Sequence, residues 1–267
     1  MTTIQVPMGN IAGIVFSLIV AWGLPTALCV VLYRKLKASL PAFFLGCATF
    51  FLFALVLEQL LHTLVIFKLG PVSEALKNNI WLYALYGGLA AGVFEETGRY
   101  LAMRFFLKKN LTKENALMYG AGHGGMEAIL ILGIPSINNL VSSILLNSGG
   151  FVSALAEDAN AQQVMESLMP LGTLPAWQFF LGGAERIIAV ALHLALSLLV
   201  YRAVKEPAKK GFFVLAILLH AAVDAMVVLI ANHGSLIFAE LVTLAGTVAI
   251  GLLAWKLVWQ QEQEIEI

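Results

Sequence analysis

Seven apolar stretches, each long enough to cross a bilayer as a helix, constrain this sequence more than any other feature. A spanning helix needs about 20 mostly apolar residues. The stretches cover residues 10–33, 40–67, 80–107, 115–133, 177–201, 211–231 and 235–257. Charged residues make up 12% of the chain, about half the share found in soluble domains, which is too few to cover a soluble surface. We therefore predict an all-α, polytopic membrane helix bundle with about seven transmembrane helices, forming a single integral-membrane domain over residues 1–267.

The basic residues between the stretches predict the orientation of the chain. One side of the predicted bilayer receives Arg34, Lys35, Lys37, Arg104, Lys108, Lys109, Lys113, Arg202, Lys205, Lys209, Lys210 and Lys256. The other side receives only Lys68 and Lys77. By the positive-inside rule, we expect a multi-pass protein of the cell membrane with the N-terminus outside and the C-terminus cytoplasmic. The lipid bilayer is therefore a predicted partner, and the net charge of zero argues against a nucleic-acid partner, since phosphate binding needs a basic patch.

Residues 134–176 form the one long connection between predicted spans, and we expect this outer loop on the extracellular side. It mixes asparagine, serine and glycine with short apolar patches, and residues 157–169 have a weak helical pattern. Connections this long are usually functional or disordered. Two interpretations remain open: a surface helix with turns, or a lid or re-entrant segment over a site.

Thirteen ionisable side chains fall inside the predicted spans, where a charge is costly. The penalty at the centre of a helix is about 2.5–3.5 kcal/mol even on a lenient insertion scale, so such groups usually mark a functional site. These residues are Glu58, His62, Glu95, Glu96, Arg99, His123, Glu127, Glu185, Arg186, His193, His220, Asp224 and Glu240. The set predicts a polar site inside the bundle.

Helical spacing groups these residues into pairs. Glu95 and Glu96 precede Arg99 by four and three residues, so that one carboxylate can pair with Arg99 while the other points elsewhere. Three further pairs lie four residues apart on single helix faces: His123 with Glu127, His193 with Ser197, and His220 with Asp224. Four predicted spans therefore each contribute polar side chains to one face.

The depths of these residues in the bilayer match. At a rise of about 1.5 Å per residue, the three histidines lie roughly 12–14 Å from the cytoplasmic ends of their spans, and the two adjacent glutamates roughly 17–18 Å. We expect them to meet in one layer. Four residues nearer the other side are predicted to form a second, outer polar cluster of structural ion pairs: Glu58, His62, Glu185 and Arg186.

The composition of the predicted layer suits hydrolytic chemistry. Two adjacent carboxylates can act as general base and as electrostatic support. Converging imidazoles suit either zinc ligation or stabilisation of an oxyanion. The pairs Gly88 with Gly92 and Gly120 with Gly124 predict close helix packing beside the layer. No His-Glu-x-x-His motif is present, which argues against a zincin.

The order of these motifs resembles that of the YhfC family of intramembrane metalloproteases, which is similar to PrsW-type proteases and to the CAAX-protease and bacteriocin-processing (CPBP/Abi) family. The resemblance rests on Glu-Glu-x-x-Arg at 95–99, His-Gly-Gly-Met-Glu at 123–127, the stretch from Glu185-Arg186 to Ser197, and His-x-x-x-Asp at 220–224. It covers nearly the whole chain, from the second predicted span to the sixth.

The resemblance implies an intramembrane protease that cleaves membrane-embedded or membrane-proximal proteins or peptides, with zinc as the implied cofactor. It implies Glu95 or Glu96 as the base that activates water, and it makes His123, His193 and His220 metal ligands or oxyanion donors. Arg99, Glu127 and Asp224 complete the implied catalytic set, with Asp224 orienting His220 or holding the water. The first motif has two residues between Glu96 and Arg99, where CAAX proteases have three, so prenylated substrates do not follow from the resemblance.

Two other functions fit the same residues. A transporter or proton pathway also places Glu, His and Arg inside a membrane, although no interrupted helix pair recurs in two halves of the sequence. A non-catalytic membrane scaffold would use the polar layer only to hold its helices together.

Overall fold

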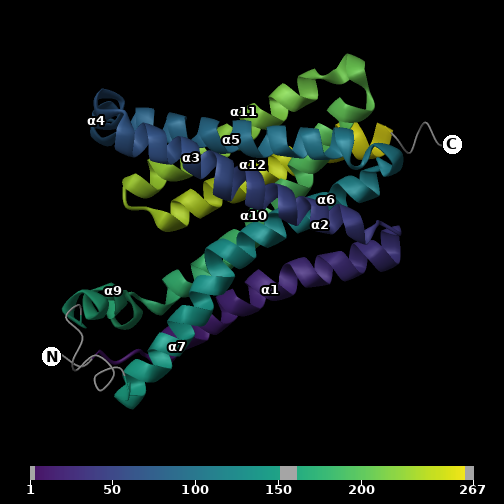
Figure 1. The fold of residues 1–267 in the computed structure, drawn as a ribbon. Coiled ribbons are helices and arrows are strands. Elements are labelled where there is room, and N and C mark those ends of the chain that lie inside the picture. Colours follow the sequence, from purple (N-terminus) through teal and green to yellow (C-terminus); the bar gives the residue numbers. More distant parts are fainter. Residues whose placement is uncertain (1–3, 151–160, 262–267) are drawn as a thin grey trace. The chain divides into compact units, whose positions relative to one another are not determined.

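The computed structural model describes residues 4–150 and 161–261, and all regular structure in those ranges is helical (Figure 1). The α-helices are α1 (Met8–Leu36), α2 (Leu40–Phe50), α3 (Gln59–His62), α4 (Gly70–Asn78), α5 (Ile80–Phe105), α6 (Lys113–Ala128), α7 (Ile134–Ser148), α9 (Ala161–Thr173), α10 (Ala176–Lys205), α11 (Gly211–Asn232) and α12 (Leu236–Ala254). Short π-helical stretches at Phe51–Glu58, Thr63–Lys68, Ile129–Gly133 and Trp255–Trp259 extend or join several of them. The all-α prediction is confirmed.

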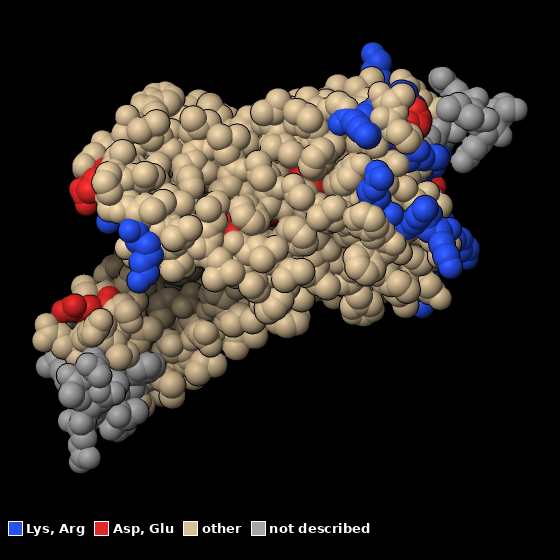
Figure 2. Space-filling model, turned by 45° about the horizontal axis from the view of Figure 1, so that its top comes forward, with Lys and Arg blue, Asp and Glu red and all other residues tan. Residues whose placement is uncertain are grey.

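Six helical segments of the described chain are long and apolar enough to cross a membrane: Met8–Leu36, Leu40–Lys68, Lys113–Ser148, Ala176–Lys205, Pro207–Asn232 and Leu236–Trp259. Helix α5 has 26 residues, which is long enough to cross a membrane. It carries more charged residues than these six segments allow in their most apolar parts, namely Glu95, Glu96, Arg99 and Arg104. The prediction of about seven transmembrane helices is confirmed. Figure 2 shows Lys and Arg concentrated toward one end of the visible face, beside a broad belt almost free of charged side chains.

The connection predicted over residues 134–176 contains two helices in its described parts: α7, which was not predicted, and α9, which overlaps the weak helical pattern expected at residues 157–169. Helix α7 continues directly from α6 through the π-helical stretch Ile129–Gly133, and α9 forms a second helix. Pro135 lies in the first turn of α7, where the wider π-helical turn before it accommodates the missing N–H. The polar residues are also compatible with a helix, because Ser143 Oγ donates to the backbone oxygen of Asn139 at 2.6 Å. Part of the predicted loop, residues 151–160, lies outside the described residues.

The chain forms two compact units, here called the first and second unit. The first unit comprises the chain up to Leu24 together with Ala128–Ile187, and the second comprises Pro25–Glu127 and the chain from Ile188 onward. The single-domain organisation stays a prediction.

Two asparagine side chains and a small apolar core hold the first unit together. Asn147 receives the backbone N–H of Val6 at 2.8 Å and donates to the Val6 carbonyl at 2.9 Å. Asn10 Nδ2 donates to the carbonyls of Leu171 and Leu174 at 2.8 and 2.9 Å. These bonds satisfy backbone groups at helix ends, where no intrahelical partner exists.

Glycines set the close helix packing of the second unit. Gly88 and Gly92 face the backbone of α11, and a Cβ atom on Gly92 would lie 2.7 Å from the Ile217 oxygen. Gly120 and Gly124 face α10 in the same manner, with a Cβ on Gly120 placed 2.9 Å from the His193 oxygen. The predicted small-residue contacts are confirmed. They bring α5 against α11 and α6 against α10, which is what positions the polar side chains described next.

Candidate active site

The structure brings all eight predicted site residues into the second unit, on four neighbouring helices. They are Glu95, Glu96 and Arg99 on α5, His123 and Glu127 on α6, His193 on α10, and His220 and Asp224 on α11. The side chains of Glu96, Arg99 and His123 have no exposed surface. The side chain of Asp224 is the least buried of the ion-paired groups here, with 36% of its surface exposed. A charged side chain that is fully buried needs an oppositely charged or hydrogen-bonding partner, so Glu96 and Arg99 must each have one.

Glu96 is the carboxylate that pairs with Arg99. Arg99 Nη1 lies 2.8 Å from both Glu96 oxygens, and His220 Nδ1 lies 2.9 Å from Oε1. Both oxygens of Glu96 are therefore engaged, and the three groups are buried together. A carboxylate held in this way fixes its neighbours and has little freedom to accept a proton from water.

Glu95 is the freer carboxylate, as the helical spacing predicts. Its Oε2 lies 2.8 Å from His123 Nε2 and 4.0 Å from His193 Nδ1. The second ring nitrogen of His123, Nδ1, is buried without a hydrogen-bond partner. His123 therefore acts on the site chiefly through Glu95.

The hydrogen bonds of His193 determine which of its nitrogens carries the proton. Arg99 Nη2 lies 2.9 Å from Nδ1, and a guanidinium can only donate, so Nδ1 must accept. The proton is then on Nε2, which donates to Glu127 Oε2 at 2.5 Å. The lone pair of Nδ1 consequently points to the side of the ring where Glu95 and Arg99 lie.

His220 lies between two carboxylates. Its Nδ1 donates to Glu96 Oε1 at 2.9 Å, and its Nε2 is 3.5 Å from Asp224 Oδ2. An ionised carboxylate only accepts, so Nδ1 must carry a proton. Nε2 then faces Asp224 either with a second proton or with a lone pair that a cation can use.

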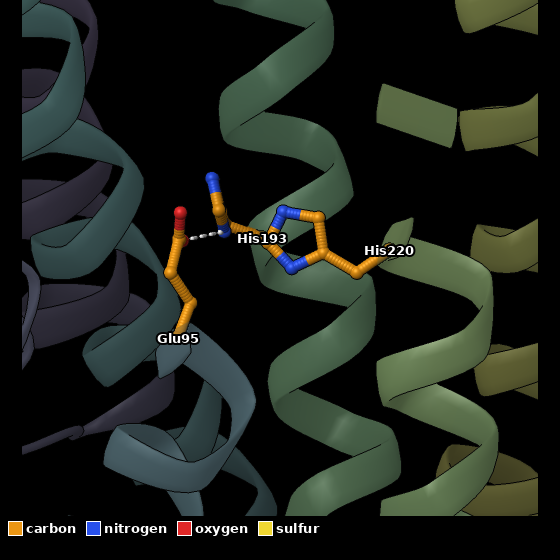
Figure 3. A group of neighbouring side chains, drawn as sticks. All are labelled: Glu95, His193 and His220. Carbon is orange, nitrogen blue, oxygen red and sulfur yellow. Dashed lines mark ion pairs between the residues drawn. The ribbon is translucent and has the colours of Figure 1, made fainter. Parts of the chain in front are cut away.

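Glu95, His193 and His220 can hold a metal ion, because one ligand atom from each lies within 4.8 Å of the others. Figure 3 shows the three side chains converging from α5, α10 and α11. Two histidines and a glutamate, with water in the fourth position, are a donor set of catalytic zinc sites. The sequence predicted His123, His193 and His220 as the ligands, whereas this group has Glu95 in place of His123. The ligand set of three histidines therefore stays a prediction.

Each member of this group has an outer hydrogen-bond partner. Glu127 accepts from His193, Glu96 accepts from His220, and His123 donates to Glu95. Ligating histidines commonly donate their other ring N–H to a carboxylate, which fixes the ring and raises its basicity. The residues present therefore fit a divalent metal in both their donor atoms and their supporting contacts.

The charge of the site also favours a cation. Four carboxylates (Glu95, Glu96, Glu127 and Asp224) face one guanidinium, that of Arg99. Unbalanced buried charge is costly, so the excess negative charge must be met by protons on the carboxylates or the histidines, or by a metal ion.

The four residues of the predicted outer cluster form two ion pairs. His62 Nε2 lies 3.1 Å from Glu58 Oε1, and its Nδ1 lies 2.8 Å from Tyr86 Oη. Glu185 and Arg186 pair with each other in the first unit. The pairing is confirmed, whereas a single cluster of all four stays a prediction. Tyr86 was not predicted, because its contact with His62 depends on how α5 packs and leaves no mark in local spacing.

Comparisons with known proteins give a family model and a relative that match most of the chain. The model of a family described as YhfC intramembrane metalloprotease matches residues 18–246. A Bacillus subtilis (strain 168) protein described as "Uncharacterized membrane protein YhfC" is 44% identical over 210 residues, which cover 79% of this chain and 81% of that protein. No solved structure matches the chain. The matched range includes all eight site residues.

Proposed function

The chain belongs to the YhfC intramembrane metalloprotease family, and we propose on this premise that it hydrolyses peptide bonds of membrane-embedded or membrane-proximal substrates. The observation that carries the proposal is the buried group of Glu95, His193 and His220, whose ligand atoms lie within 4.8 Å of one another. A network of ion pairs that only holds helices together does not need three possible metal-ligand atoms pointing at one place. Nor does it need a second hydrogen-bond partner behind each of the three side chains. Membership of the wider PrsW-type and CPBP families stays a prediction.

We assign the role of metal ligands to Glu95, His193 and His220, with zinc as the proposed ion. Zinc bound there would supply Lewis acidity toward the scissile carbonyl and toward a water molecule. His193 Nδ1 is the ring nitrogen without a proton because Nε2 donates to Glu127, and a metal ion bound there would replace the hydrogen bond that Nδ1 accepts from Arg99. His220 keeps Nε2 for the same purpose because Nδ1 donates to Glu96.

The remaining site residues orient the ligands. Arg99 holds Glu96 through both carboxylate oxygens, so Glu96 keeps His220 in one ring orientation. Glu127 does the same for His193, and His123 fixes the carboxylate of Glu95. In this assignment Glu96 is a positioning residue, and neither Glu95 nor Glu96 is the general base that the sequence predicted.

Asp224 is the proposed general base. Its Oδ2 lies 3.5 Å from His220 Nε2, and its side chain is 36% exposed, so it can reach both the group and a water molecule. Asp224 would take a proton from the attacking water and pass it to the leaving amine as the C–N bond breaks. The products are a free carboxyl group and a free amine, and Asp224 returns to its starting state.

The test compares membrane proteomes of cells that produce the wild-type chain or a variant. Mass spectrometry of new peptide termini should detect cleavage within or beside transmembrane segments for the wild type, and not for Glu95→Gln or Asp224→Asn. The matched control is His62→Ala, which removes a histidine paired with a glutamate outside the group and should leave the termini unchanged. Identical termini from the wild type and Glu95→Gln would refute the proposal.

One observation favours a second candidate, a proton pathway. Two runs of titratable groups, Glu127 with His193 and Glu96 with His220 and Asp224, approach each other on either side of the permanently charged Arg99. Such runs occur in membrane proton relays. Proteoliposomes holding a pH gradient and an internal pH dye would distinguish the two, because a relay dissipates the gradient and a protease does not.

A further inference from the structure

We propose that a basic cavity at the ends of α5 and α10 binds the phosphate of an anionic phospholipid headgroup. The cavity has a volume of about 500 Å³ and is lined by Arg104, Phe105, Lys108, Leu111, Val204 and Lys205. This volume falls in the range of small-molecule sites, about 300–1,000 Å³. None of its residues belongs to the candidate active site, and the proposal does not depend on protease activity.

Two of the three cations are held in place by tyrosines. Arg104 Nη1 donates to Tyr100 Oη at 3.0 Å, and Lys205 Nζ donates to Tyr201 Oη at 2.8 Å. Both cations also lie near the faces of these rings, at 5.9 and 5.3 Å from the centroids. The phenol hydroxyls orient both side chains at the cavity, and at Arg104 the hydroxyl does so without cancelling the positive charge.

Two of the cations that line the cavity, Arg104 and Lys108, lie away from the carboxylates of the described residues. Glu206 lies 3.0 Å from Arg202 and 3.4 Å from Lys209. In the described ranges, no carboxylate lies within ion-pair distance of Arg104 or Lys108. The cavity thus joins cations from the last turn of α5, the following turn and the last turn of α10. Clusters of this kind at the ends of membrane helices bind anionic headgroups.

The other lining residues favour a lipid over a free anion. Phe105, Leu111 and Val204 give the same cavity an apolar wall, and Phe105 is 65% exposed. Inorganic phosphate gains nothing from apolar contacts, whereas the upper acyl chain of a phospholipid buries surface against them. α10 spans the membrane by length and composition, so its basic last turn is expected at headgroup level.

The test measures lipid binding to the full chain after delipidation in a neutral detergent. Native mass spectrometry would follow titration with a short-chain phosphatidylglycerol, with phosphatidylcholine and with inorganic phosphate as separate arms. Each cation near a membrane surface is worth about 1 kcal/mol, or about fivefold in affinity. The triple variant Arg104→Gln, Lys108→Gln, Lys205→Gln should therefore bind phosphatidylglycerol about a hundredfold more weakly than the wild type.

A matched control removes the same charge outside the cavity. The variant Lys35→Gln, Lys109→Gln, Lys210→Gln changes three exposed lysines that do not line the cavity, and it should retain wild-type affinity. Equal loss in both triple variants would show a general charge effect and overturn the proposal. Equal binding of phosphatidylcholine, or of inorganic phosphate, would overturn the assignment to an anionic phospholipid. Thermal unfolding of both variants checks that each is folded.

Discussion

Two adjacent glutamates on one helix have different surroundings and therefore different roles. Glu96 is fully enclosed by Arg99 and His220, whereas Glu95 contacts His123 and lies 4.0 Å from His193. Because successive residues on a helix point about 100° apart, one carboxylate meets α11 and the other meets α6 and α10. The proposed division between a supporting carboxylate and a metal-ligating carboxylate rests on this geometry.

The substitution Glu96→Gln should destabilise the protein strongly. It leaves the guanidinium of Arg99 buried without its carboxylate, and breaking a buried pair from one side costs about 3–5 kcal/mol. Thermal unfolding in detergent, with metal removed from every sample by a chelator, should show a clearly lowered Tm for Glu96→Gln and a nearly unchanged Tm for Glu95→Gln. Equal Tm values for the two variants would show that the Arg99 pair is not what holds α5 in place.

The substitution His123→Ala should weaken metal binding without abolishing it. His123 holds Glu95 by a hydrogen bond and is not proposed as a metal ligand. Mutating a residue that hydrogen-bonds to a metal ligand typically lowers metal affinity 10- to 100-fold. Chelator competition against zinc would measure the affinity of the purified variant. Complete loss of stoichiometric zinc in His123→Ala would instead support the ligand set of three histidines predicted from the sequence.

At the scale of helices, the site depends on the close approach of α5 and α11. Gly92 lies against the α11 backbone, while Gly87, one turn earlier on the same helix, has nothing within 4 Å of a Cβ atom. This difference provides a matched pair of substitutions.

The substitution Gly92→Ala should lower stability by about 1–3 kcal/mol, because the added methyl group forces the helices apart. It should also weaken zinc binding, since Glu95 and His220 lie on the two separated helices. Gly87→Ala adds the same methyl group in open space and should be neutral or slightly stabilising. Comparing Tm and zinc affinity of the two variants tests whether the packing positions the site, and identical behaviour would exclude it.

Helix positions were largely predictable from the sequence, and contacts between helices were not. The stretch predicted at 80–107 forms α5 from Ile80 to Phe105, because a long apolar run in a bilayer has no alternative to a helix. Helix α7 was missed because Pro135 and the following asparagines resemble a loop. Pairs within one helix, such as His220 with Asp224, follow from spacing, whereas Glu95 with His123 and Arg99 with His193 depend on packing.

At the scale of the whole molecule, charge placement predicts the orientation. Lys and Arg gather toward one end of the visible face (Figure 2), and this end is predicted to be cytoplasmic. A green fluorescent protein fused to the C-terminus should therefore fluoresce in cells, and alkaline phosphatase fused there should be inactive. The opposite pair of results would reverse the orientation and place the basic cavity in the outer leaflet.

The metal content of the purified protein tests the central claim most directly. Elemental analysis of the full chain should find about one zinc per molecule in the wild type and in the control His62→Ala, as expected for a site with three protein ligands and an open fourth position. The variants His220→Ala and His193→Ala should each lose it while remaining folded by circular dichroism. Zinc retained at full stoichiometry in both variants, or proteolysis by a wild-type protein that contains no metal, would contradict the account.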